Sequence, residues 1–159
     1  MATDKGLKKD AELGSNLDKA IFPGLQGGPH DHQTAAIAIA LKEAGTPAFK
    51  KYAKQVVKNA KAFGEALEKK GWRVITGGTD SHLLLIDTWA NGKGLSGKEA
   101  SDKLEGAGII VNMNTIPQDP RVVMDPSGIR VGTAAETTRG AKEKDFVAIA
   151  NKMDTILRS

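Results

Sequence analysis

A long amphipathic segment between Pro47 and Gly71 constrains the fold more than any other part of the sequence. Thr46 can cap a helix that starts there, Pro47 suits its first turn, and Gly71 favours its end. The apolar residues recur every three or four positions, which places them on one face of an α-helix. They are Phe49, Tyr52, Ala53, Val56, Val57, Ala60, Phe63 and Leu67. The sequence therefore predicts one long helix with a single buried face.

After Gly71 the apolar period shortens to that of β-strands. Strands are predicted at 72–76, 82–87, 109–111 and 129–131. Ser96 and Glu99 have the spacing of a capping box and predict a helix through about 107, and a last helix is predicted over 146–157. This order of elements, with short turns, predicts an α+β fold in which a small, mainly antiparallel sheet carries helices on one face.

The segment 22–32 is glycine-rich and runs into residues 31–44, which are apolar nearly all round and predict a buried helix. Glycines allow close backbone approach, and the first turn of a helix offers unpaired N–H groups to an anion. Two interpretations stay open at this point. The segment is either a structural turn that starts a helix or an anion site. The first twenty residues are polar and predict irregular structure with a short helix around 10–20.

Composition excludes several classes of function. The chain of 159 residues has no cysteine, which rules out disulfides, thiolate metal sites and a cysteine nucleophile, and no metal site is predicted from three histidines. No apolar run suits a signal peptide or a membrane span, so a cytoplasmic protein without membrane contact is expected. Seven lysines between Lys50 and Lys70 contribute to a net charge of +4. They interleave with apolar residues at helical spacing, so we expect a solvated helix face and not a nucleic-acid site.

The loop after the third predicted strand is long, polar and stiffened by prolines, which is typical of a functional connection. It leads to Arg130, whose neighbours Ile129 and Val131 are apolar. We expect Arg130 to point inward from its strand, where it must have a partner because its guanidinium stays charged. The partner is either an internal Asp or Glu, or the carboxylate of a ligand, which the planar guanidinium can bind through two hydrogen bonds.

Four motifs in this order resemble the serine hydroxymethyltransferase family, and Thr137-Thr138-Arg139-Gly140 extends the likeness. The motifs are Phe22-Pro23-Gly24-Leu25-Gln26-Gly27-Gly28-Pro29, Thr76-Gly77-Gly78-Thr79-Asp80, Val111-Asn112-Met113-Asn114-Thr115-Ile116-Pro117 and Ser127-Gly128-Ile129-Arg130-Val131-Gly132-Thr133. An ordered set of this kind is far more specific than any single motif. The resemblance implies an α/β-class, fold-type I enzyme that uses pyridoxal 5'-phosphate. Such an enzyme interconverts serine plus tetrahydrofolate with glycine plus 5,10-methylenetetrahydrofolate.

The resemblance also implies roles for particular residues. Arg130 is similar to the arginine that binds the carboxylate of the amino-acid substrate. Gln26, Gly27 and Gly28 are similar to the turn that reaches the cofactor phosphate of the neighbouring subunit, in a homodimer or higher homo-oligomer. Asn114 is similar to a folate-contacting asparagine. Val122, Val123 and Met124 occupy the place of a further folate-contacting segment, where the family usually has Ser-Pro-Phe.

The family's cofactor-bearing lysine lies in a threonine-rich run that ends in His-Lys, and this sequence has no such run. The resemblance therefore implies the C-terminal portion of the enzyme, without a catalytic residue of its own and inactive alone. Residues 1–46 are expected to be the end of the large cofactor-binding domain. Residues 47–159 are expected to form a long connecting helix and a small domain. The alternative is a free-standing binding or assembly module that keeps the fold but has no enzyme activity.

Overall fold

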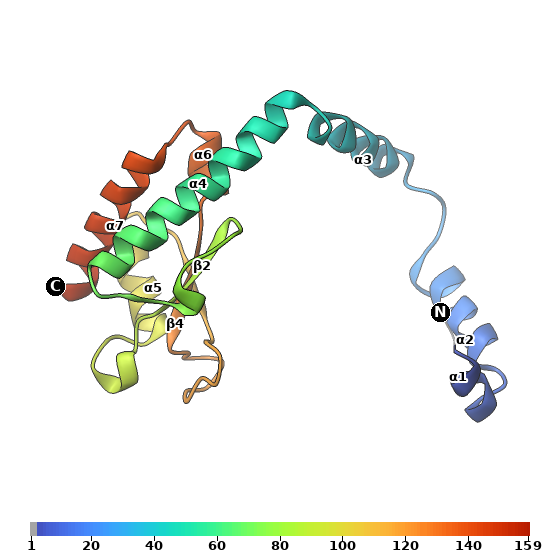
Figure 1. Ribbon diagram of the computed structural model, residues 1–159. Coiled ribbons are helices and arrows are strands. Elements are labelled where there is room, and N and C mark those ends of the chain that lie inside the picture. The colour runs from blue at the N-terminus through green and yellow to red at the C-terminus, as the bar shows by residue number, and fades with distance from the viewer. Residues whose placement is uncertain (1–2) are drawn as a thin grey trace. The chain divides into compact units, whose positions relative to one another are not determined.

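The computed structural model describes residues 3–159, so Met1 and Ala2, with which the predicted 1–46 domain begins, lie outside the described residues. The chain divides into two compact units, and the second begins at Gly45. Figure 1 shows the elements of both units. The predicted boundary between an enzyme's large and small domains remains a prediction.

The first unit is helical. It contains α1 (Asp4–Lys9), α2 (Leu13–Lys19), the π-helix η1 (Ala20–Leu25) and α3 (Asp31–Ala44). Irregular structure was predicted for the first twenty residues, but Thr3 caps α1 through a hydrogen bond from the Gly6 amide to its side chain. Local capping of this kind starts a helix even in a polar sequence.

The predicted helix over 31–44 is confirmed as α3, but its predicted burial is not found in this chain. No residue of α3 is buried. Ile37, Ile39 and Leu41 are each at least 60% exposed. A unit of this size has little apolar surface with which to cover a helix that is apolar nearly all round.

The second unit starts with the long helix α4 (Pro47–Lys69), which confirms the central prediction from the sequence. Thr46 caps it by accepting a hydrogen bond from the Phe49 amide at 3.2 Å. The strands are β1 (Arg73–Val74), β2 (Leu83–Asp87), β3 (Asn112–Asn114) and β4 (Gly128–Gly132). The 3₁₀ turns η2 (Ile75–Gly77) and η3 (Ala90–Gly92) follow β1 and β2. The other helices are α5 (Gly97–Gly106), α6 (Ala134–Thr138) and α7 (Glu143–Arg158).

The four strands form one antiparallel sheet in the order β1-β2-β4-β3. The third strand was predicted at 109–111, but β3 covers the following three residues, Asn112–Asn114. Ile109 and Val111 instead pack against the core as partly buried side chains. The apolar side chains of these two residues serve core packing, and the prediction misread them as the side chains of a paired strand.

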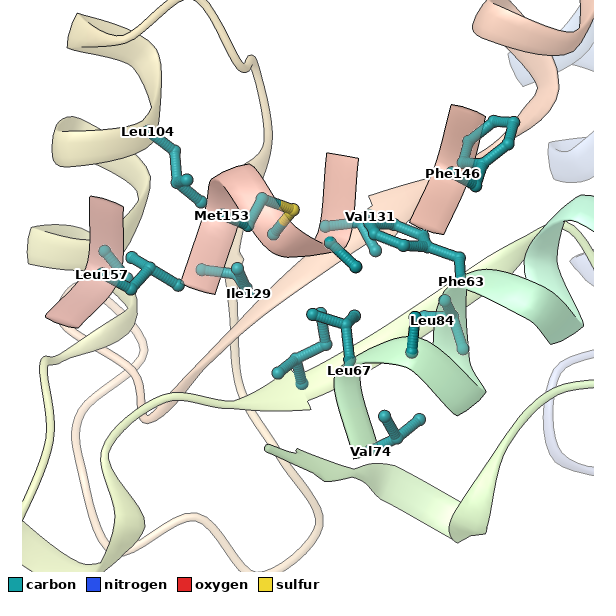
Figure 2. Packing of buried hydrophobic residues seen from close by; sticks show 14 residues of the cluster. Phe63, Leu67, Val74, Leu84, Leu104, Ile129, Val131, Phe146, Met153 and Leu157 are labelled. Atoms are coloured by element: carbon teal, nitrogen blue, oxygen red, sulfur yellow. The ribbon is translucent and has the colours of Figure 1, made fainter. Parts of the chain in front are cut away.

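The core lies between one face of the sheet and the helices α4, α5 and α7, which confirms the predicted α+β arrangement. Figure 2 shows side chains from the helices facing Leu84, Ile129 and Val131 of the sheet. Phe63 of α4 and Phe146 of α7 meet with ring centroids 5.7 Å apart at an interplanar angle of 54°. Tilted contacts at this distance are favourable for aromatic pairs.

A buried polar group joins α4 to the segment that follows β4. The side-chain amide of Asn59, which is fully buried, donates to the Thr137 hydroxyl at 2.8 Å and to the Ala141 carbonyl at 3.0 Å. Its oxygen accepts a hydrogen bond from Gln55 at 2.8 Å. Because Asn59 and Thr137 are buried and the other two partners are partly buried, the network fixes how α4 sits against α6 and α7.

Asn59→Leu should lower the free energy of unfolding by about 2–3 kcal/mol, because the buried Thr137 hydroxyl and the partly buried Gln55 amide and Ala141 carbonyl lose a partner at once. Urea denaturation followed by circular dichroism measures this loss. Asn151→Leu is the matched control, since Asn151 is exposed on α7. Equal stabilities of the two variants would contradict a structural role for the network.

Candidate functional site

The candidate site lies on the face of the sheet opposite the core. Alternation along β4 turns Ile129 and Val131 toward the helices and Arg130 away from them. Leu85 on β2 and Asn112 on β3 stand directly beside Arg130 in the register of the sheet. Residues paired across antiparallel strands point to the same face, so these three side chains share the outer face.

The prediction that Arg130 points inward is wrong. Arg130 is exposed, because its two apolar neighbours occupy the inward positions of the strand. Its Nε donates to Oδ1 of Asn112 at 3.2 Å. Among residues 3–159, Arg130 forms no ion pair, so the internal partner that we considered is not found there. The terminal nitrogens of the guanidinium remain available to an anion.

Asn114 lies on the same outer face as Arg130. It pairs with Gly128 in the strand register, two residues along from the pair formed by Asn112 and Arg130, and residues two apart on a strand share a face. Its side chain is half-buried, and its Nδ2 donates to the Thr115 carbonyl at 2.7 Å. The structure thus brings two predicted site residues, Arg130 and Asn114, onto one surface.

Val122, Val123 and Met124 lie in the loop between β3 and β4, and they are 69%, 73% and 75% exposed. Three consecutive apolar side chains in solvent are unusual for a connection that is otherwise anchored. Such exposed apolar groups often mark a contact surface.

Asp119, which was not among the predicted site residues, organises this loop. Asp119 accepts hydrogen bonds from the Ile116 and Ser127 amides on Oδ2, at 3.1 and 3.0 Å. It accepts from the Arg121 amide and the Ser127 hydroxyl on Oδ1, at 2.9 and 2.6 Å. Aspartate binds nearby backbone amides in turns, so an aspartate between prolines could have been recognised as an anchor.

Partial burial by itself would raise the pKa of Asp119. The hydroxyl and amide of Ser127, with the amides of Arg121 and Ile116, outweigh that effect and lower the pKa to about 2. The ionised carboxylate is therefore the form that holds the loop.

This shift predicts a specific acid sensitivity. A carboxyl whose pKa is lowered by folding stabilises the fold fully above its ordinary pKa of 3.8, and the stabilisation is lost as the pH falls through about 2. The free energy of unfolding should be measured by urea denaturation from about pH 5 to about pH 2, a range that includes both pKa values. It should fall more steeply with pH for the native chain than for Asp119→Asn. Other carboxyls, such as Asp154 held by Arg158, contribute equally to both proteins. Parallel curves would contradict the assignment.

Gln26, Gly27 and Gly28 belong to the first unit and follow the π-helix η1. The Gln26 amide donates to the Ile21 carbonyl at 2.7 Å. The amides of Gly27 and Gly28 donate to no backbone carbonyl of residues 3–159. A Cβ built on either glycine meets no atom within 4 Å. The turn therefore offers two free N–H groups in open space just before α3.

Residues 3–159 contain no group of three or more His, Asp or Glu side chains arranged to hold a metal ion. None of the helices in that range combines the length and the apolar character needed to cross a bilayer.

Comparison with known proteins places these features in a family. The family model described as "Serine hydroxymethyltransferase" matches residues 1–153. The chain therefore belongs to the serine hydroxymethyltransferase family. It is 50% identical over 149 residues to the serine hydroxymethyltransferase of Desulfotalea psychrophila, a match that covers 94% of this chain and 35% of the relative. It is 54% identical over 143 residues to that of Sorangium cellulosum, which covers 90% of this chain and 33% of the relative. The chain thus spans about a third of the length of these relatives.

Proposed function

We propose that the chain forms the substrate-carboxylate and folate side of a serine hydroxymethyltransferase that uses pyridoxal 5'-phosphate. The complete enzyme would interconvert serine and tetrahydrofolate with glycine and 5,10-methylenetetrahydrofolate. Residues 1–46 would be the end of the large domain, and residues 47–159 the connecting helix and the small domain. The observation that carries the proposal is the exposed guanidinium of Arg130, placed beside Asn112 and Asn114 on the outer face of the sheet.

Arg130 would bind the carboxylate of serine or glycine. Its Nε is held by Asn112, so the side chain is oriented while its terminal nitrogens stay free. A guanidinium held in this way loses less rotamer entropy when it binds, and it can form two parallel hydrogen bonds to a carboxylate. This contact would orient the amino acid for reaction.

Asn114 and the exposed run Val122 to Met124 would contact the folate co-substrate. Asn114 supplies a polar side chain on the same face as Arg130, and the loop supplies three apolar ones. A ligand that combines an aromatic body with polar groups matches such a surface, because sites of this kind pair apolar walls with a few directed polar groups.

The turn Gln26–Gly28 would contact the cofactor phosphate of a neighbouring subunit. Its chemistry fits an anion, since the free amides of Gly27 and Gly28 have no side chain nearby to block an approach. When bound, pyridoxal phosphate supplies an electron sink for cleavage at the α-carbon of the amino acid. A homodimer or higher homo-oligomer would also provide apolar surface for the exposed side chains of α3.

The test uses the pure chain with serine, tetrahydrofolate and pyridoxal phosphate. We expect no 5,10-methylenetetrahydrofolate, because no lysine of this sequence stands in the family's cofactor-binding run. Activity should appear in an assembled enzyme, formed by this chain and the lysine-bearing remainder of a full-length family relative. Steady turnover by the pure chain would contradict the proposed division of roles. A well-folded but inactive assembly would instead favour the binding or assembly module.

A further inference from the structure

The connection between β3 and β4 contains an anchored frame and an unanchored tip. The frame is built on Asp119, which binds Ile116 on one side of the loop and Ser127 on the other. Ile116, Pro126 and Ser127 are buried. A single carboxylate therefore ties together the two ends of the loop, directly after β3 and directly before β4.

A second anchor, Arg121, holds the loop against Trp89. The guanidinium of Arg121 lies 4.1 Å from the ring centroid of Trp89, which follows β2. Its Nε donates to the Asp125 carbonyl at 2.9 Å, and it forms an ion pair with the Asp125 carboxylate. Cation–π contact and ion pair together hold Arg121 in one conformation.

The tip, Val122 to Met124, lies between these anchors, and all three of its side chains are exposed. Its side chains contribute nothing to the frame that holds them. Six polar contacts of Asp119 and Arg121 thus hold the backbone that presents three apolar side chains to solvent. Such an arrangement suits a contact surface that is prepared before its ligand arrives.

We propose that Asp119 is a positioning residue for the second substrate, which holds the loop so that Asn114 and the tip keep the orientation needed to bind a folate. This inference rests on the proposed function. Asp119 acts through the backbone of residues 116–127 and touches no substrate. The amino-acid side of the site depends on it less, because the side chain of Arg130 is held by Asn112.

Asp119→Asn is the sharpest test. The substitution replaces one of two acceptor oxygens by an NH₂ group, which would then face a backbone N–H or the Ser127 hydroxyl. Asp102→Asn is the matched control, because Asp102 is exposed on α5 and its side chain makes no hydrogen bond or ion pair with residues 3–159. Both variants are made in the full chain.

The first measurement is amide hydrogen exchange on the full chain alone. In Asp119→Asn, exchange at Ile116, Arg121 and Ser127 should accelerate about tenfold or more, the effect of losing one charged hydrogen bond. Amides of α4 and α7 should keep their native rates. Unchanged exchange in the loop, or a uniform acceleration throughout the chain, would overturn the positioning role.

The second measurement uses the assembled enzyme. In Asp119→Asn, the KM for tetrahydrofolate should rise about tenfold, as expected for one lost charged contact, while the KM for serine stays within about twofold. Asp102→Asn should leave both unchanged. An equal rise in both KM values, or none, would overturn the inference. If the native assembly has no activity, the proposed function fails, and the exchange experiment still decides whether Asp119 holds the loop.

Discussion

Replacing Gly97 by alanine should unfold much of the second unit. A Cβ at this position would lie 2.0 Å from the carbonyl oxygen of Gly128 and 3.1 Å from that of Pro126. Both atoms belong to the backbone at or just before the start of β4, and the Gly97 amide donates to the Pro126 carbonyl at 2.6 Å. The clash cannot be relieved by a side-chain rotation, so α5 would have to leave the sheet. We expect a loss of about 3–5 kcal/mol in urea denaturation, at the severe end of single substitutions.

Gly106→Ala in the same helix provides the control. A Cβ at Gly106 meets no atom within 4 Å. Alanine is the better helix former, so this variant should gain up to about 1 kcal/mol. A loss of similar size in the two variants would show that the clash at Gly97 is not the cause.

Replacing Arg130 by lysine should weaken serine binding in the assembled enzyme. Lysine keeps the charge but has a single ammonium, so it loses the two parallel hydrogen bonds to the substrate carboxylate and the bond from Nε to Asn112. A loss of about 1.5–3 kcal/mol for a charged hydrogen bond corresponds to a rise of roughly 10- to 100-fold in the KM for serine. Steady-state kinetics at saturating tetrahydrofolate measures this effect.

The control for this experiment is Arg158→Lys. Arg158 is the same residue type, but it lies at the end of α7 and stacks over Trp72 with its guanidinium carbon 5.1 Å from the ring centroid. It should change the KM for serine by no more than about twofold, since distant surface contacts are worth little to the site. A KM for serine that is unchanged in Arg130→Lys would contradict the carboxylate role.

Local signals in the sequence predicted the elements that depend on local interactions. The long helix α4 follows from the period of Phe49 to Leu67 and the cap at Thr46. The capping box of Ser96 and Glu99 is present, with both of its hydrogen bonds formed. These features involve residues within a few positions of one another, so the sequence alone determines them.

Features that depend on distant partners were harder to predict. The position of β3 and the outward direction of Arg130 both follow from the register with β4 and β2, which no local pattern encodes. The predicted direction of Arg130 was wrong because Ile129 and Val131 were assumed to surround it. Side chains alternate along a strand, so these two neighbours lie on the opposite face of the sheet. Asp119 was missed because its partner Ser127 lies eight positions further along a loop without periodicity.

The place of β4 in the sheet has a consequence for how the protein is made. β4 follows the other three strands in the sequence, yet it lies between β2 and β3 and is the only strand of the described sheet that pairs with β3. During synthesis β3 therefore has no strand partner until residues 128–132 have left the ribosome. Arg130 is part of the strand that closes the sheet. The surface that carries Arg130, where we propose that the substrate carboxylate binds, is therefore assembled only when β4 enters the sheet beside β2 and β3.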